Sequence, residues 1–523
     1  MSPPPPANAT TRVSPKHAAF VLTPTSALFD VLSFHAQHRA HAGALRFDGD
    51  QITYARMHVL SLTMLGQLLA RGIQAGDRVA YLGLNHPLQI ILLFALARLG
   101  AMLVPLNYRL AHAELCATLR DCTPRWLVCD LHWEKQGWDL ASSMATTAPI
   151  TCIALDALTA AQEKDALAHY HGQASDPALL VYTSGTTGMP KGAVHTQRNL
   201  LANMALASAT QDMTADDLVL TVLPLFHVGG LCIQTLPALF VGAQVIVHPR
   251  FEAKTTLDCI QSERPGLTLQ VPATLQALIE HPHWQDTDLS GLRAVWAGSS
   301  LLPESLLQAF HARAIPVCNV YGSTESGPFS IALPPVWAQS HMGSCGWPVH
   351  TQNLTVELRL QQPQDEVGEL CLRGPNVVSH YWPCTAATDG DGFLHTGDLA
   401  RQAPDGSITI VGRAKDMLIS GGENIYPAEI ENILLTHPLV ADCAIVGLPD
   451  AQWGEIAVAC VVLRQPTSST LDVQDLLQTL LAQRLARYKL PRHWLWLTEL
   501  PKTALGKVQK NILAQLVSTS RVL

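Results

Sequence analysis

Residues 182–192 are the segment best suited to chemistry, with the sequence YTSGTTGMPKG directly after an apolar run. Glycines let the backbone approach a ligand closely, the hydroxyls of Ser184, Thr186 and Thr187 can donate hydrogen bonds, and Lys191 adds positive charge. This combination favours a phosphate-binding loop. It is not the G-x-x-x-x-G-K-[ST] loop of P-loop nucleotide hydrolases, because Pro190 precedes the lysine and a glycine follows it. For this segment alone, a glycine-rich surface loop is the alternative interpretation.

Four further segments carry residue types that suit nucleotide chemistry. They are YGSTES at 321–326, HTGD at 395–398, GRAKDMLISGGENIYPAEIE at 412–431 and PKTALGKVQK at 501–510. Together with residues 182–192, and in the same order, these segments resemble the signature motifs of the adenylate-forming superfamily. That superfamily contains acyl- and aryl-CoA synthetases, adenylation domains of peptide synthetases, and luciferases. Since the general layout before residue 182 also fits, the resemblance covers nearly the whole chain.

The resemblance implies an AMP-forming acid:CoA ligase that uses ATP, Mg²⁺ and CoA. A carboxylate would attack the α-phosphorus of ATP, pyrophosphate would leave, and the acyl group would then pass to the CoA thiol. Because two anions must be held together, the first step needs positive charge and magnesium. Glu325 is the implied magnesium ligand, since a hard cation prefers oxygen. Taken without its motif, this residue would be a solvated surface acid.

The resemblance also assigns the nucleotide-binding residues. Thr324 is expected at the α-phosphate, Tyr321 offers an aromatic face to adenine, and Asp398 with Arg413 is expected at the ribose hydroxyls. The other implied ATP-binding or AMP-binding residues are Thr183, Ser184, Gly185, Thr186, Thr187, Gly188, Lys191, Gly298, Ser299, Ser300, Asn319 and Gly322.

Lys507 is the implied catalytic lysine, which would bridge the carboxylate and the phosphate in the first half-reaction only. The small C-terminal domain would then rotate about Lys415 and admit the thiol. The implied CoA-binding residues are Gly421 and Gly422 along the pantetheine arm, and Trp453 and Lys489 near the nucleotide end. Without the motifs, Lys507 would be a solvated surface residue and the glycine pair would only shape a turn.

The acid substrate is expected to be hydrophobic, because the segments that would line its pocket are small or apolar and contain no evident arginine or lysine. His227 matches a position that gates access to the acyl carbon, although a lone histidine on an apolar segment is more often a core residue. The other implied pocket residues are Val228, Gly229, Val271 and Gly327. A fatty, aryl or alicyclic acid would fit equally well.

The pattern of strands and helices predicts an α/β fold in two domains. Residues 1–16 are expected to form a mobile tail, 17–413 a large multi-layer α/β domain that binds AMP, and 414–523 a small mobile α+β cap. A β-rich subdomain is expected from about Glu357 onward. The apolar stretch Leu88–Leu106 contains Arg98 and is broken by glycine and proline. It therefore favours a buried helix to about Leu99 and a short strand over a membrane span.

Length and composition exclude several classes of protein. The chain has 523 residues, 48% apolar and 15% charged, with a net charge of −8. These values argue against a small binding module, a disordered chain and a non-specific nucleic-acid binder. The twelve cysteines form no C-x-x-C pair, so a reducing, cytoplasmic location is expected. His35, His38 and His41 could suggest a metal site, but without acidic or cysteine partners a solvated helical face is preferred.

Two other functions compete with CoA ligation. The first is a free-standing adenylation enzyme that loads a carrier protein. The second is a non-catalytic ATP-binding protein, against which the intact motifs around Glu325 and Lys507 argue. The expected partners are a small carboxylic acid, ATP and CoA, and the sequence is also compatible with a homodimer.

Overall fold

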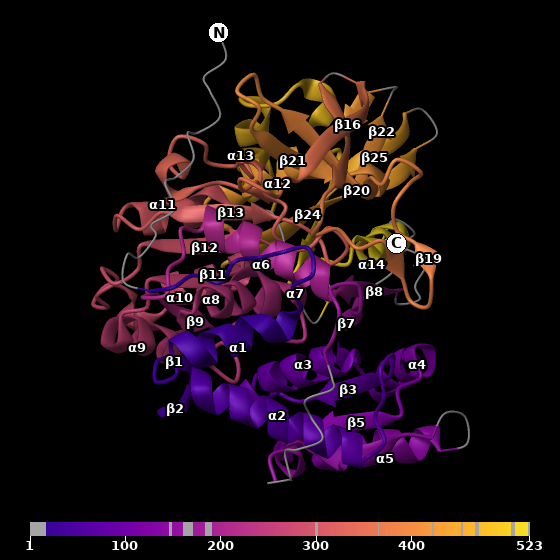
Figure 1. Ribbon diagram of the computed structural model, residues 1–523. Coiled ribbons are helices and arrows are strands. Elements are labelled where there is room, and N and C mark those ends of the chain that lie inside the picture. Colours follow the sequence, from indigo (N-terminus) through magenta and orange to yellow (C-terminus); the bar gives the residue numbers. More distant parts are fainter. Residues whose placement is uncertain are drawn as a thin grey trace.

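Four β-sheets and their covering helices make up the computed structural model, with a large N-terminal domain below a smaller C-terminal domain in Figure 1. This arrangement confirms the α/β fold class predicted from the sequence. The structure describes residues 17–145, 149–160, 171–183, 191–298, 302–364, 366–420, 423–450, 453–465, 470–503 and 508–520. The expected tail at residues 1–16 lies outside this part of the chain.

The first layered unit is an eight-stranded sheet with the order β19-β18-β8-β7-β4-β3-β5-β6. Its strands from β6 to β7 pair in parallel, whereas β7 and β8 form an antiparallel pair. The strands are β3 (Arg78–Leu82), β4 (Met102–Pro105), β5 (Trp126–Cys129), β6 (Thr151–Ala154), β7 (Pro177–Thr183), β8 (Lys191–Thr196), β18 (His380–Tyr381) and β19 (Thr385–Ala386). The associated helices are α2 (Tyr54–Ala70), α3 (Pro87–Leu99), α4 (His112–Cys122) and α5 (Glu134–Met144).

Helix α3 is buried along most of its length, and β4 follows it, as predicted for Leu88–Leu106. Pro87 starts the helix, and Gly100 ends it in the left-handed region with φ = 78°. Arg98 lies over the ring of Phe29, with 4.3 Å from the guanidinium carbon to the ring centroid. Among the described residues, no helix is both long and apolar enough to cross a membrane.

The second layered unit is a nine-stranded sheet with the order β15-β14-β13-β12-β11-β9-β10-β1-β2. Its six strands from β13 to β1 pair in parallel, so their carboxyl ends share one edge. The strands are β1 (Gly43–Phe47), β2 (Asp50–Thr53), β9 (Leu218–Thr221), β10 (Gln244–Val247), β11 (Leu267–Gln270), β12 (Ala294–Gly298), β13 (Val317–Tyr321), β14 (Ile331–Ala332) and β15 (Trp347–Pro348). The associated helices are α1 (Leu28–His38), α6 (Gln197–Thr210), α7 (Val228–Gly230), α8 (Leu236–Val241), α9 (Ala253–Glu263), α10 (Pro272–Ile279) and α11 (Glu304–His311).

The β-rich subdomain expected from Glu357 is a four-stranded antiparallel sheet with the order β16-β17-β20-β21. Its strands are β16 (Glu357–Gln364), β17 (Val367–Arg373), β20 (Leu394–Gln402) and β21 (Ile408–Arg413). Strand β21 ends at the residue where the sequence analysis ends the large domain.

The C-terminal domain is built on a fourth sheet, in which β24 and β25 form a long antiparallel hairpin. Its strands are β22 (Leu418–Ser420), β23 (Glu423–Ile425), β24 (Val440–Asp450), β25 (Gly454–Leu463) and β26 (His493–Leu497). Its helices are α12 (Pro427–Leu435), α13 (Thr470–Ala482) and α14 (Lys510–Ser520). Strand β26 pairs in parallel with β25 and was not predicted.

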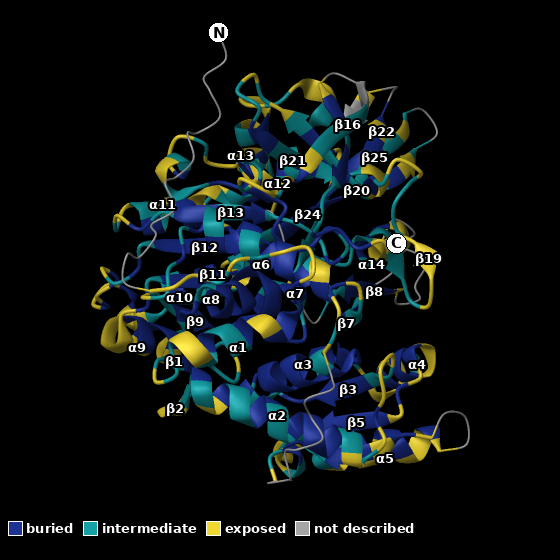
Figure 2. Cartoon of the chain, viewed as in Figure 1, coloured by how far each residue is buried: buried dark blue, intermediate teal, exposed yellow. Residues whose placement is uncertain are grey.

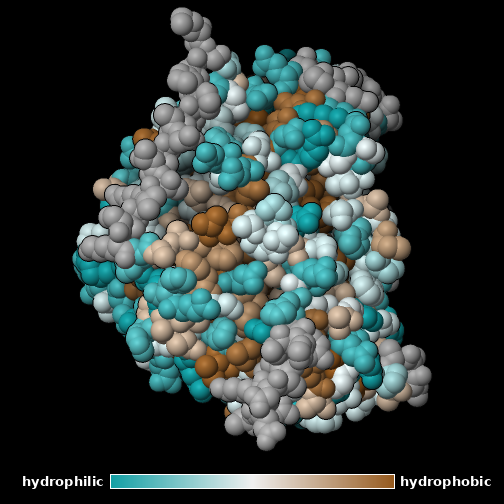
Figure 3. All heavy atoms as spheres, in the orientation of Figure 1, coloured by the Kyte–Doolittle hydropathy of each residue, from teal (hydrophilic) through white to brown (hydrophobic). Residues whose placement is uncertain are grey.

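The two domains have separate buried cores (Figure 2). One large apolar cluster joins both layered units of the N-terminal domain, and other clusters fill the two faces of the C-terminal sheet. In helix α13, Val473, Leu477 and Leu481 are buried, whereas Leu476 is 54% exposed. On the outer surface, hydrophilic and hydrophobic residues are interspersed (Figure 3).

One prediction about the N-terminal histidines was wrong. His38 and His41 are exposed, as expected of a solvated face, but His35 is fully buried on helix α1. Its Nε2 donates a hydrogen bond to the carbonyl of Phe240 at 2.9 Å. Burial lowers the pKa of His35 to about 4. The three-residue spacing therefore reflects one core contact and two surface positions.

The buried His35 makes stability depend on pH. Its folded-state pKa lies below the ordinary 6.5, so this contribution is complete above pH 6.5 and is lost as pH falls toward 4. We expect the free energy of unfolding to fall by about 3 kcal/mol from this group over that interval. His35→Gln should flatten the dependence in urea unfolding followed by tryptophan fluorescence, and the exposed His41→Gln should leave it unchanged. Equal pH slopes for His35→Gln and the wild type would contradict the assignment.

Candidate active site

Residues from three sheets meet at the predicted site. Tyr321 ends β13 of the nine-stranded sheet, Thr183 ends β7 of the eight-stranded sheet, and Asp398 lies on β20 of the subdomain. Ligands commonly bind outside the carboxyl ends of parallel strands, where neighbouring loops separate. The described motif residues therefore meet where a ligand site is expected in this class of fold.

Asp398 contacts two other predicted nucleotide residues at this meeting point. Its Oδ2 accepts a hydrogen bond from the Tyr321 hydroxyl at 2.7 Å, and its Oδ1 pairs with Nε of Arg413 at 3.0 Å. Asp398 and Arg413 are also cross-strand partners on β20 and β21. Burial, reinforced by the charge of Asp398, raises the pKa of Tyr321 well above its usual value, so the tyrosine stays a donor. The predicted adenine and ribose residues thus form one hydrogen-bonded group.

Glu325 lies where the two large sheets face each other. Its Oε1 accepts hydrogen bonds from the hydroxyls of Thr183 and Tyr381, each at 3.3 Å. The ammonium of Lys191 lies 5.5 Å from the centroid of the Tyr381 ring. Within the described part of the chain, no lysine or arginine forms an ion pair with Glu325. A half-buried carboxylate with neutral hydroxyl neighbours suits a Mg²⁺ ion, which takes oxygen ligands and keeps much of its water.

The ends of the glycine-rich segment lie side by side. Thr183 and Lys191 are cross-strand partners at the ends of β7 and β8, so the segment between them is closed by an antiparallel pair. A P-loop hydrolase has a helix after the loop, and the strand β8 found here agrees with excluding that class. Strand β8 itself was not predicted. Of the predicted phosphate residues, Ser184, Gly185, Thr186, Thr187 and Gly188 lie outside the described residues.

Close packing explains two glycines beside the nucleotide residues. A Cβ on Gly298 would lie 2.3 Å from the carbonyl oxygen of Val320, and one on Gly322 would lie 2.5 Å from the backbone of Pro328. Asn319 donates to the carbonyl of Ser344 at 3.1 Å, and Thr324 is buried. These contacts pack β12 closely against β13 and bring residues 328 and 344 against the end of β13. Ser299 and Ser300 lie outside the described residues.

The predicted acyl-pocket residues follow the carboxyl ends of β9, β11 and β13. His227 is half-buried, and its Nδ1 accepts a hydrogen bond from the backbone of Gly229 at 3.3 Å, which caps the short helix α7. Val228 is buried in the main apolar cluster, and Val271 packs against that cluster. Gly327 has φ = 65°, and a Cβ there would lie 2.7 Å from the carbonyl of Asn376, so its backbone conformation requires glycine.

The predicted hinge and CoA residues lie in or before the C-terminal domain. Lys415 is exposed in the short 3-10 turn Ala414–Asp416, between β21 and β22. Lys489 forms an ion pair with Glu429, which also lies 3.6 Å from Arg401 of the large domain. Gly421 and Gly422 lie outside the described residues.

Trp453 has a cationic neighbour that the sequence did not reveal. The guanidinium of Arg492 lies 4.3 Å from the centre of the Trp453 ring, at a distance typical of a cation–π contact. No sequence signal could have found this pair, because 39 positions separate the two residues in the chain.

Lys507 lies outside the described residues, but both flanks of its segment are held against the C-terminal domain. Lys502 pairs with Asp442 at 2.5 Å and forms a β-bridge with Val508. Lys510 pairs with Glu431 at 2.7 Å. Described residues on both sides of the predicted catalytic lysine therefore have defined contacts in the C-terminal domain.

Three side chains that contact motif residues or predicted site residues belong to none of the motifs. Tyr381 reaches Glu325 from β18, Arg401 reaches Glu429 across the domain boundary, and Arg492 covers Trp453. Tyr381 and Arg401 lie between recognised motifs and have no distinguishing pattern of their own. Only the folded arrangement brings them to the site.

Known proteins are similar to this chain along most of its length. An indoleacetate–CoA ligase from Aromatoleum aromaticum is 42% identical over 91% of this chain and 97% of its own length. A fatty acid–[acyl-carrier-protein] ligase, ScoC, from Streptomyces coeruleorubidus is 35% identical over 92% and 95%.

Two solved structures extend the comparison. The anthranilate CoA ligase AuaEII in complex with anthranoyl-AMP superposes with a TM-score of 0.86 at 26% identity, covering 96% of this chain and 99% of the other. The o-succinylbenzoate CoA synthetase of Bacillus subtilis, in complex with ATP and a magnesium ion, gives 0.82 at 29% identity, covering 93% and 99%.

Family models match both parts of the chain. The AMP-binding enzyme model matches residues 32–382, and the model of the AMP-binding enzyme C-terminal domain matches residues 429–507. The first match alone spans more than half of the sequence. As the motifs at residues 182–510 predict, the chain belongs to the AMP-binding enzymes of the adenylate-forming superfamily.

Proposed function

We propose that this protein is an AMP-forming ligase that joins an aryl or arylalkanoic acid to CoA. The observation that carries the proposal is the hydrogen-bonded group of Tyr321, Asp398 and Arg413, since Tyr321 precedes Glu325 by four residues and Glu325 contacts Thr183 at the paired ends of the 183–191 segment. An acid–thiol ligase needs ATP, Mg²⁺ and CoA, and this group offers separate contacts to ribose, adenine and phosphate. The aryl class is the finer part of the proposal. It is supported by the similarity to an indoleacetate ligase and an anthranilate ligase.

In the first half-reaction, the chain's own residues hold the nucleotide and the acid. The carboxylate of Asp398 accepts hydrogen bonds from the ribose hydroxyls, and Tyr321 orients its ring beside adenine. Lys191 and the hydroxyls before it contact the phosphates, while Lys507 bridges the acid and the α-phosphate. Glu325 would hold the magnesium ion, which when bound would supply positive charge to offset that of the phosphate oxygens. The carboxylate oxygen bonds to the α-phosphorus as the bond to pyrophosphate breaks.

In the second half-reaction, the thiol must reach the acyl carbon, so the C-terminal domain moves about Lys415 and carries Lys507 away. We place the domain boundary at 413/414, where β21 ends and the exposed turn begins. Met417 and Tyr426 pack with Val367 and Val411, so the movement must open this small apolar cluster and the Arg401–Glu429 contact. Both contacts are small, and a small interface between domains allows one domain to move relative to the other.

CoA would approach along Gly421 and Gly422, with its nucleotide end near Trp453 and Lys489. Arg492 adds a second positive charge beside Trp453. Lys489 would exchange Glu429 for a CoA phosphate.

A cytoplasmic location and a homodimer stay predictions, and the absence of disulfides among the twelve cysteines fits a reducing compartment.

A second candidate is loading of a carrier protein, which the similarity to the fatty acid–[acyl-carrier-protein] ligase favours. Both functions share the first half-reaction and differ only in the thiol acceptor. The experiments must therefore separate adenylation from thioester formation.

A panel of acids tests the proposed substrate and acceptor. We expect AMP formation with indoleacetate, hydroxycinnamates and aminobenzoates, with kcat/KM at least about tenfold above straight-chain fatty acids, because shape and apolar contact discriminate by about this factor. The acyl product should appear on free CoA. A thioester formed only on an added carrier protein would instead support the second candidate. Equal kcat/KM values for the aryl acids and the straight-chain fatty acids would contradict the aryl class.

Asp398→Asn tests the nucleotide contacts. The substitution removes the charge that holds Tyr321 and Arg413, so we expect KM for ATP to rise by about tenfold to a hundredfold, as for the loss of hydrogen bonds to a charged group. Acid-dependent pyrophosphate release measures the effect. The matched control is Asp405→Asn, in the turn between β20 and β21. A similar rise in the control would mean that the defect comes from the hairpin.

Lys507→Ala tests the division of labour between the half-reactions. We expect formation of acyl-adenylate to fall at least about a hundredfold, because a charge that stabilises the transition state is lost. Thioester formation from supplied acyl-adenylate should stay near the wild-type rate in single-turnover measurements. Lys254→Ala, at an exposed pair with Asp258, is the control. Equal loss in both steps would contradict the assigned role.

A further inference from the structure

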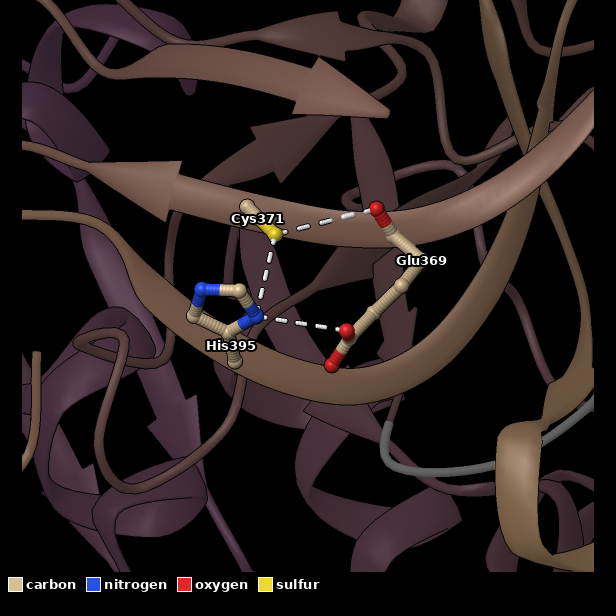
Figure 4. A group of neighbouring side chains, drawn as sticks. All are labelled: Glu369, Cys371 and His395. Atoms are coloured by element: carbon tan, nitrogen blue, oxygen red, sulfur yellow. Dashed lines mark hydrogen bonds and ion pairs between the residues drawn. The ribbon is translucent and has the colours of Figure 1, made fainter. Parts of the chain in front are cut away.

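A cluster of Glu369, Cys371 and His395 lies on the antiparallel pair β17 and β20, outside the nucleotide site (Figure 4). Cys371 and His395 are direct cross-strand partners, and Glu369 lies two residues before Cys371, which puts all three side chains on one face of the sheet. One potential ligand atom from each residue lies within 4.8 Å of the other two.

Two of the three distances between these atoms match a tetrahedral metal site, and the third, between the Glu369 carboxylate and Cys371 Sγ, is within 4.8 Å. His395 Nδ1 lies 3.2 Å from Glu369 Oε2 and 3.6 Å from Cys371 Sγ. Tetrahedral bonds of about 2.0 Å to nitrogen and oxygen and about 2.3 Å to sulfur put the ligand atoms about 3.3 Å (N to O) and 3.6 Å (N to S) apart. An ion could therefore enter without large movement of either side chain.

A second carboxylate orients the histidine. Asp389 Oδ2 lies 3.1 Å from His395 Nε2, so this nitrogen donates and Nδ1 faces the glutamate and the thiol. Asp389 is itself held by the backbone of Phe393 at 2.9 Å and by Arg359 at 2.7 Å. Metal-binding histidines usually donate their second ring nitrogen to a carboxylate in this way.

We propose that Glu369, Cys371 and His395 bind one divalent cation of the zinc class, with water as the fourth ligand. Thiolate and imidazole ligands select zinc-class ions, whereas magnesium prefers oxygen alone, so this site is distinct from Glu325. Cys371 is buried and His395 is exposed, so the ion enters from the solvent side. The positive charge of Arg359 would repel a cation. It is offset by the carboxylates of Asp389 and Asp391, which lie 2.7 and 3.6 Å from the Arg359 guanidinium.

The site lies next to the nucleotide-binding turn. Glu369 Oε1 accepts a hydrogen bond from the backbone of Gly397 at 3.0 Å, and Gly397 directly precedes Asp398. The other oxygen of the same carboxylate is the proposed ligand. Glu369 would therefore contact both the ion and the turn that carries the ribose-binding aspartate.

Cobalt substitution tests the proposal on the full chain. After chelator treatment and its removal, Co²⁺ should bind with one equivalent per chain and give a thiolate charge-transfer band and the visible bands of a four-coordinate ion. Zn²⁺ should abolish these bands, and excess Mg²⁺ should not. Cys371→Ser should remove the charge-transfer band. The matched control is Cys384→Ser, at an exposed cysteine outside the cluster, which should retain the band.

A second variant tests the orienting carboxylate. Asp389→Asn leaves all three ligands in place, and we expect it to weaken Co²⁺ affinity by about tenfold to a hundredfold. Circular dichroism checks that each variant is folded. A wild-type protein without a stoichiometric cobalt band, or a band that survives in folded Cys371→Ser, would overturn the proposal.

Discussion

The hydrogen bond from Tyr321 to Asp398 joins two sheets that have no strand pairing at this point, and the nucleotide site depends on it. Tyr321 comes from the end of a parallel strand, whereas Asp398 comes from an antiparallel hairpin whose other strand carries Arg413. A buried tyrosine that stays protonated is a fixed donor, so Asp398 has one defined orientation. Contacts between Glu325 and Thr183 attach the third sheet in the same way. Hydrogen bonds between sheets therefore assemble the site.

The contacts between the two domains are weaker than the contacts within either domain. Exposed or partly exposed ion pairs, such as Arg401–Glu429 and Arg464–Glu280, contribute little stability in water. The apolar cluster that includes Met417 and Tyr426 is small compared with the cores of either domain. By contrast, Lys502 and Lys510 anchor the segment that carries Lys507 within the C-terminal domain. A cap that moves as one body, with its lysine attached, is consistent with both features.

Some secondary structure followed from local pattern, and several of the errors have local causes. The buried helix α3 was predicted well, since an apolar run bounded by Pro87 and Gly100 leaves few alternatives. Strand β8 was missed because it directly follows a motif that resembles a loop. Strand β26 was missed because its sequence, HWLWL, is also compatible with a surface segment. His35 was misassigned because the three-residue histidine spacing does not report which face meets the core.

The sequence by itself determined the family, the class of reaction and the identity of the motif residues, because the chemistry of binding two anions restricts residue types at short spacing. Only the tertiary structure decided which of these residues meet and through which neighbours. Tyr381, Arg401 and Arg492 carry no pattern in the chain, yet they contact Glu325, Glu429 and Trp453. The pairing of β17 with β20 likewise creates the cluster of Glu369, Cys371 and His395. Such contacts form between strands or domains that are far apart in the sequence. The number of residues between two positions does not determine their distance in the folded protein.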